Sequence, residues 1–130
     1  MKNRATATFT VAATLAAALT ACSSSDAKPA ADTPPYKITR QDTSGNQRRV
    51  SVEVTNTKDL RAVFDDVAGK LDDDAGWFVE INCKTGGTSK ADNRLANGKK
   101  AVGSIGAATT GLEDGKTEYE ANKGATCPAS

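Results

Sequence analysis

The sequence contains no histidine, and it has three cysteines, one tryptophan and one methionine among its 130 residues. Histidine is the usual general base of nucleophilic catalysis and the commonest metal ligand, so its absence argues against both kinds of site. No two cysteines stand in a C-x-x-C pair, the spacing common in zinc and dithiol redox sites. The sequence therefore predicts a non-enzymatic protein with no metal site and no cofactor.

Charge is balanced along the chain, with 17 basic and 16 acidic residues. The one basic cluster is Arg48–Arg49 with Arg40 nearby, which is typical of an edge strand whose charges block pairing with other chains. Nucleic-acid binding needs a concentrated basic face, so the sequence predicts no nucleic-acid partner.

The N-terminus has the three regions of a secretory signal. A basic start, MKNR, is followed by a modest apolar run that four threonines dilute, and the run ends in small residues. The alternative is a transmembrane helix, but the run is short of about 20 residues. No basic stop follows it either, because the next segment is SSSDAKPAADTPP. The pattern predicts export.

Leu19-Thr20-Ala21-Cys22 resembles the lipobox of bacterial lipoproteins, an aliphatic residue and two small residues before a cysteine. The resemblance implies cleavage after Ala21 and a diacylglyceryl group on the Cys22 sulfur. It predicts a chain anchored by lipid on the extracytoplasmic face of the cell membrane, because two or more acyl chains give stable anchoring. The alternative is cleavage after Ala18, which would leave Cys22 as a free thiol.

This interpretation divides the chain into a signal peptide (1–21), a flexible tether (22–35) and a small globular domain (36–130). The tether holds no large apolar residue and cannot form a core. With Cys22 used for lipid, Cys83 and Cys127 remain as an even pair, and in an exported chain such a pair predicts a disulfide. Closing this loop would contribute about 4 kcal/mol in the chain-entropy model.

Two runs of alternating apolar and polar residues, 36–40 and 50–54, flank a turn at Gly45-Asn46 and predict a β-hairpin. From Leu60 to Leu71 the apolar residues recur every three or four positions, which predicts an amphipathic helix.

We expect Thr57 to cap this helix and Asp59 to lie in its positive first turn. The helix should end near Leu71, because the acids at 72–74 are unfavourable at a helix C-terminus.

The strongest predicted strand is residues 77–83, WFVEINC. Asn97-Gly98 predicts a two-residue turn between strand segments at 94–96 and 99–105, and residues 117–121 predict the last strand. The order, ββα and then further strands, predicts an α+β fold: an antiparallel sheet of about five strands, with one helix on one face and one disulfide. The predicted core consists of Ile38, Val50, Val52, Val54, Leu60, Val63, Phe64, Val67, Trp77, Val79, Ile81, Val102 and Ile105.

Two segments resemble ligand-binding loops only in part. Residues 111–117, GLEDGKT, have three residues between the glycines where a phosphate loop needs four, so a β-turn is favoured and no nucleotide is predicted. DDDAG at 72–76 suggests calcium. However, its glycine comes one position early and Cys83 stands where the loop needs Glu, which favours a solvated turn.

Carboxylate pairs can hydrolyse glycosides without histidine, so Asp65, Asp66, Glu80 and Asp114 are nominal candidates for a small hydrolase. The small-residue stretch 103–111 suits a bulge, a close backbone approach or the floor of a groove. Together with the polar loop KTGGTSKADNR, it is the place where the sequence predicts a binding surface.

The segment RLANGKKAVGSIGAATTGLEDG and the later TCP are similar to small exported lipoproteins of high-GC Gram-positive bacteria. This resemblance implies no functional site. The sequence thus favours a membrane-anchored binding or interaction module that engages an envelope or extracellular partner. The alternatives are an inhibitor of an extracellular hydrolase and a small carboxylate-based hydrolase.

Overall fold

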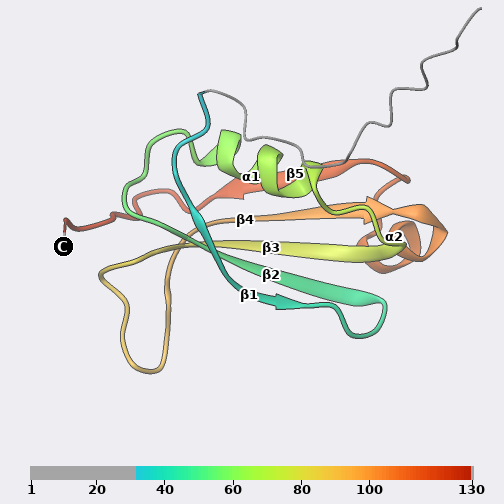
Figure 1. The fold of residues 1–130 in the computed structure, drawn as a ribbon, viewed down its shortest axis with the longest axis horizontal. Coiled ribbons are helices and arrows are strands. Elements are labelled where there is room, and N and C mark those ends of the chain that lie inside the picture. The colour runs from blue at the N-terminus through green and yellow to red at the C-terminus, as the bar shows by residue number, and fades with distance from the viewer. Residues whose placement is uncertain (1–31, 130) are drawn as a thin grey trace, which may run out of the picture.

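The computed structural model describes residues 32–129, which form one five-stranded sheet and two helices (Figure 1). The predicted signal peptide, Cys22 and most of the tether lie outside the described residues. In chain order the elements are β1 (Lys37–Asp42), β2 (Gln47–Val54), α1 (Leu60–Gly69), β3 (Ala75–Cys83), β4 (Asn93–Val102), α2 (Gly103–Thr110) and β5 (Thr117–Ala121).

The five strands lie side by side in their sequence order, which confirms the α+β class. One pairing differs from the antiparallel sheet expected, because β2 and β3 run parallel and the sheet is therefore mixed. The cause is α1. A helix between two strands carries the chain back to the end of the sheet where it started, so the next strand runs in the same direction. The other three pairings are antiparallel.

α1 packs on the sheet through the predicted apolar stripe, and Leu60, Val63, Phe64, Val67 and Ala68 are all buried. Its ends differ from those expected. Asp59, not Thr57, is the N-cap, with a left-handed backbone (φ 47°) and no side-chain capping bond.

The C-terminal end of α1 comes at Gly69, two residues early, and is capped by a side chain from the sheet. The Lys100 ammonium donates to the carbonyls of Ala68 (2.7 Å) and Leu71 (2.8 Å).

The expected turn at Asn97-Gly98 is wrong, because β4 runs unbroken through both residues. Gly98 lies directly beneath the Phe64 ring of α1, and a Cβ built at position 98 would overlap that ring. This glycine therefore allows the helix to approach the sheet and does not reverse the chain.

The strand expected at 99–105 ends at Val102, where a second helix, α2, begins, and the small residues of α2 serve a close approach. A Cβ at Gly106 would meet the carbonyl of Ala75, and one at Gly76 would meet the side chain of Thr109 at 2.7 Å. Two carboxylates from outside the helix accept bonds from its first turn: Asp114 from the Gly103 amide and Asp74 from the Ile105 amide.

Most of the predicted core is buried, including Trp77, whose indole nitrogen donates to the carbonyl of Asp73 (3.1 Å). Three predicted members are not. Ile38 is 40% exposed because β1 is an edge strand, Ile105 is 37% exposed on α2, and Val102 is only half-buried. The core lies between α1 and one face of the sheet.

Candidate functional site

The two faces of the sheet differ because side chains alternate along each strand. On β3, Val79 faces α1, since its partner Gly98 lies beneath Phe64. The opposite face has no long helix over it and is called the open face. Strand registers place on it Arg40, Asp42, Arg49, Ser51, Glu53, Phe78, Glu80, Asn82, Arg94, Asn97, Lys99, Glu118 and Glu120.

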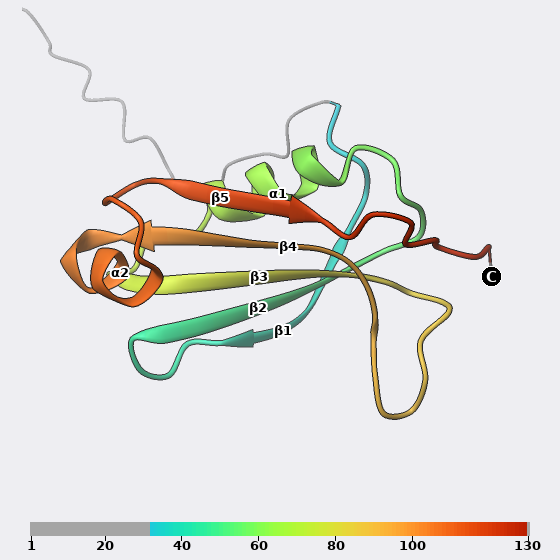
Figure 2. The same ribbon diagram turned by 180° about the vertical axis from the view of Figure 1, so that it is seen from behind.

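Two segments bound the open face at opposite ends of β3 and β4 (Figure 2). α2 covers one end, where Thr109 and Thr110 lie over Gly76. The β3–β4 loop, residues 84–92, projects from the other end. They make up most of the two stretches, 103–111 and 84–94, in which the sequence predicts a binding surface, and the fold brings both of them to one face.

A polar groove of about 650 Å³ lies between the loop and the open face. Its floor includes Ser51, Glu53 and Asn82, and the loop side includes Lys84 and Thr88. Glu53 is half-buried, and it forms no ion pair with any residue in the 32–129 range. The groove therefore presents a carboxylate together with hydroxyl, amide and ammonium groups.

An ion-pair network stands at the centre of the open face. Glu80 pairs with Arg94 at 3.0 Å and with Arg49 at 3.6 Å. Arg94 also donates to the side-chain oxygens of Asn82 (2.7 Å) and Asn97 (2.6 Å). One planar guanidinium thus holds three side chains from β3 and β4 in fixed positions.

Phe78 lies beside this network, in a hollow of about 180 Å³ that Asn97, Lys99, Glu118 and Glu120 help to line. Lys99 pairs with Glu118 at 3.4 Å and also donates to the carbonyl of Thr110 in α2 (3.1 Å). An aromatic ring at the edge of charged and amide groups can support a ligand with one apolar and one polar side.

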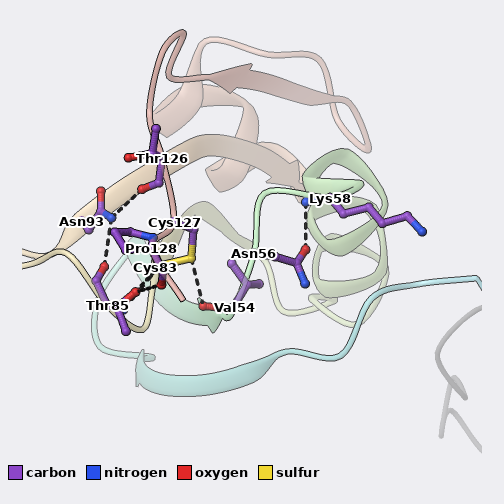
Figure 3. Close-up of a disulfide and its surroundings, with 9 residues drawn as sticks. All are labelled: Val54, Asn56, Lys58, Cys83, Thr85, Asn93, Thr126, Cys127 and Pro128. Atoms are coloured by element: carbon purple, nitrogen blue, oxygen red, sulfur yellow. Dashed lines mark hydrogen bonds between the residues drawn. A yellow bond between two sulfur atoms is a disulfide. The ribbon is translucent and has the colours of Figure 1, made fainter. Parts of the chain in front are cut away.

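The predicted disulfide between Cys83 and Cys127 is present, with Cα atoms 5.4 Å apart (Figure 3). It fixes the C-terminal segment against the start of the β3–β4 loop, which follows Cys83 directly. The Asn93 side chain donates to the carbonyls of Thr85 (2.9 Å) and Thr126 (2.8 Å), and the Thr85 hydroxyl donates to the carbonyl of Pro128. The loop is thereby tied at its root to both its own strand and the chain end.

The four nominal carboxylates do not converge. Asp65 pairs with Arg61 on α1 (3.0 Å), and Asp66 lies on the same helix. Glu80 projects from the other side of the sheet, and Asp114 accepts the Gly103 amide. Each of them is held by a structural partner, and Asp66 and Glu80 lie on opposite faces of the sheet.

Asp66 forms a three-member cluster with Tyr36 and Lys70. Lys70 donates to Asp66 (2.9 Å) and to the Tyr36 hydroxyl (2.8 Å), which in turn donates to Asp66. Burial raises the pKa of the Asp66 carboxyl, but the bonds from Tyr36 and Lys70, with the lysine charge, outweigh it and hold that pKa below its usual value. The cluster fastens the start of the domain to α1.

The segments at 111–117 and 72–76, which partly resemble a phosphate loop and a calcium loop, lack the geometry that those ligands would need. Gly111 ends α2 and residues 111–117 lead into β5, whereas a phosphate loop opens a helix. In the acidic segment, Asp73 pairs with Arg48 and Asp74 accepts the Ile105 amide. Among the described residues there is no group of three His, Cys, Asp or Glu side chains that could hold a metal ion.

The sequence did not single out Arg49, Asn82 or Asn97 as site residues, whereas Arg94 is the last residue of the polar loop predicted as a binding surface. Asn82 could have been found by its alternation with the apolar residues of β3, which puts it on the same face as the named candidate Glu80. Asn97 could not be found, and Arg94 could not be placed beside Glu80, because the turn expected at Asn97-Gly98 breaks β4 and hides which face they share.

Comparison of the chain with protein-family models, curated proteins and solved structures finds no match. Among residues 32–129, none of the helices has the length and apolar character needed to cross a bilayer.

Proposed function

We propose that this protein is an exported lipoprotein, held on the extracytoplasmic face of the membrane through lipid on Cys22, whose domain binds an envelope partner without catalysing a reaction. The lipobox-like Leu19-Thr20-Ala21-Cys22 motivates the anchor. The disulfide is consistent with an oxidising compartment outside the cytoplasm.

The observation that carries the binding role is the framing of the open face. α2 and the loop at 84–92 bound a polar face whose central side chains are already fixed by Arg94. A surface that is ordered before binding avoids part of the ordering cost of association. The separation of Asp66, Glu80 and Asp114, each with a structural partner, supports a non-catalytic role.

A second candidate, inhibition of an extracellular hydrolase, is favoured by the loop itself. Its root is tied by Cys83–Cys127 and by the two bonds of Asn93. A projecting loop with a rigid root is suited to insertion into an enzyme cleft. Tight binding of a protease or a glycan hydrolase, lost when residues 86–91 are replaced, would select this candidate.

The anchor is tested by Cys22→Ser. We expect the variant to leave the membrane fraction or to keep its signal peptide, and the native chain to carry the mass of a diacylglyceryl group on a cleaved N-terminus. A mature-sized variant that still sediments with the membrane would refute lipid anchoring.

The binding role is tested by crosslinking in intact cells followed by mass spectrometry. We expect adducts on peptides that contain the loop and β2. Repeated recovery of the uncrosslinked chain alone, at native expression, would count against a binding module.

A further inference from the structure

We propose that the open face binds a neutral, hydroxyl-rich chain, that is, a glycan without net charge. This inference rests on the proposed function, since it names the ligand class of the surface assigned to binding there. Three properties of the open face point to this class: it carries charges of both signs side by side, its apolar area is small, and its central hydrogen-bonding side chains are fixed.

Several charges of the open face lie next to an opposite charge on a neighbouring strand. Lys99 lies beside Glu118 at 3.4 Å, and Glu80 is shared by Arg94 (3.0 Å) and Arg49 (3.6 Å). Asp42 stands opposite Arg49 in the strand register. A ligand with net charge of one sign would have to compete with these pairs, whereas a neutral ligand leaves them in place.

The apolar area is too small for the core of a typical protein interface. Phe78 is the only large apolar side chain that the described strands place on the open face. Protein interfaces usually centre on several buried aromatic or apolar anchors. One ring in a hollow of about 180 Å³ suits instead the C–H face of a single sugar, whose hydroxyls would then reach Asn97 and Glu120.

The hydrogen-bonding groups of the open face offer both donors and acceptors. Arg94 holds the side-chain oxygens of Asn82 and Asn97, so each amide presents its NH2 group as a donor. The NH2 group of Asn82 lies at the groove, and that of Asn97 uses one hydrogen on the Asn122 side chain (3.5 Å) and keeps a second. Glu53 supplies an acceptor on the groove floor. Sugar hydroxyls donate and accept at once, so they match such a mixed set better than groups that only accept or only donate.

The spacing of the two depressions favours a chain over a single sugar. Phe78 lines the hollow and Asn82 lines the groove, and both project from β3 to the same side. Four residues along a strand span roughly 13 Å. A ligand that fills both depressions therefore has several linked units running along β3.

The test is a titration of the full, isotope-labelled chain, as isolated, with short oligosaccharides followed by amide chemical shifts. The probes are neutral oligomers of hexose and of N-acetylhexosamine, with an oligouronate and a mixed-charge peptide as comparisons. We expect a neutral oligomer to shift resonances of Phe78, Asn82 and Asn97 and to leave α1 unchanged. Shifts with the oligouronate or the peptide alone would overturn the inference.

Two variants separate a stacked sugar from incidental contact. Phe78→Leu keeps an apolar side chain but removes the ring, and it should weaken binding of the neutral oligomer by about threefold to tenfold. Ile38→Ala, an exposed apolar residue of β1 on the other face, should leave affinity unchanged. Equal effects of both variants, or no binding of any neutral oligomer, would overturn the inference. A protein crosslinked to the open face in cells would then still support the proposed function.

Discussion

The two faces of the sheet use the same strands for different purposes. Towards α1, β3 presents Trp77, Val79 and Ile81, each at most 2% exposed. Towards the open face it presents Phe78, Glu80 and Asn82, which contact charged and amide side chains of β2 and β4. One face is specified by the burial of apolar surface, and the other by ion pairs and hydrogen bonds at fixed positions.

This difference separates stability from recognition. Apolar burial supplies most of the free energy of folding, so the α1 face should tolerate little change. Partly exposed ion pairs contribute little to stability, so the residues of the open face are constrained less by folding than by the ligand that the face binds. The predictions below, from the largest expected effect to the smallest, test this division.

The first prediction compares one chemical change on the two faces. Phe64→Ala removes a fully buried ring and should lower the free energy of unfolding by about 3–5 kcal/mol. Phe78→Ala removes a half-buried ring and should cost less than half of that. Urea unfolding followed by the fluorescence of Trp77 measures both. Equal losses would mean that the open face contributes to the core as much as the α1 face does.

The second prediction concerns the disulfide. Replacing Cys83 and Cys127 together by Ser should cost about 4 kcal/mol at most in the chain-entropy model. The loss should be accompanied by faster amide hydrogen exchange in residues 84–92, while β3 and β4 keep their protection. Unchanged exchange in the loop would show that the C-terminal segment does not organise the groove.

The third prediction breaks the network of the open face. Glu80→Gln removes the charge shared by Arg49 and Arg94 and should cost about 1–2 kcal/mol, since bonds to charged groups are worth somewhat more than neutral ones. Arg49→Ala, at the exposed side of the same carboxylate, should change stability by less than about 0.5 kcal/mol. A larger loss for Arg49 than for Glu80 would contradict the central place given to the carboxylate.

The fourth prediction concerns unfolding at low pH and the Asp66 carboxyl of α1. The pKa of Asp66 is lowered in the folded protein, so its contribution is present above the unfolded pKa of about 3.9 and is lost as pH falls through the folded value. Tyr36→Phe removes one bond to that carboxylate and should move acid unfolding to slightly higher pH, with a smaller change at neutral pH. Thr39→Val is the control, because the Thr39 hydroxyl donates to the carbonyl of Ser51 and not to a carboxylate. This variant should leave the pH of acid unfolding unchanged.

The sequence predicted those parts of the fold that depend on local periodicity: the hairpin, the stripe of α1, β3 and the Cys83–Cys127 pair. It failed where a residue is explained by a distant neighbour. Asn97-Gly98 indicated a turn from the local pattern alone. The real reason for the glycine is the close approach of Phe64, which lies 34 positions earlier in the chain and leaves no sign in that pattern. The small residues around Gly106 indicated a bulge, a close backbone approach or a groove floor, and the close approach is the one observed. The helix that makes this approach, on Ala75 and Ala101, was not expected.

The candidate site was predicted as segments and not as residues. The small-residue stretch and the polar loop are recognisable by composition, and both border the open face. The network between them depends on the register of β3 with β4, including its irregularity between Ile81 and Asn82. Register is set by the packing of the whole sheet, so Arg94 could not be assigned to Glu80 from spacing alone.

The most direct test of the account compares photo-crosslinking in living cells from two arginine positions of nearly equal exposure. Arg49 lies on the open face and is 56% exposed, and Arg61 lies on α1 and is 59% exposed. With a diazirine amino acid at each position in turn, the account predicts adducts from position 49 and none from position 61. Adducts from position 61 alone, or equally from both, would contradict the assignment of recognition to the open face.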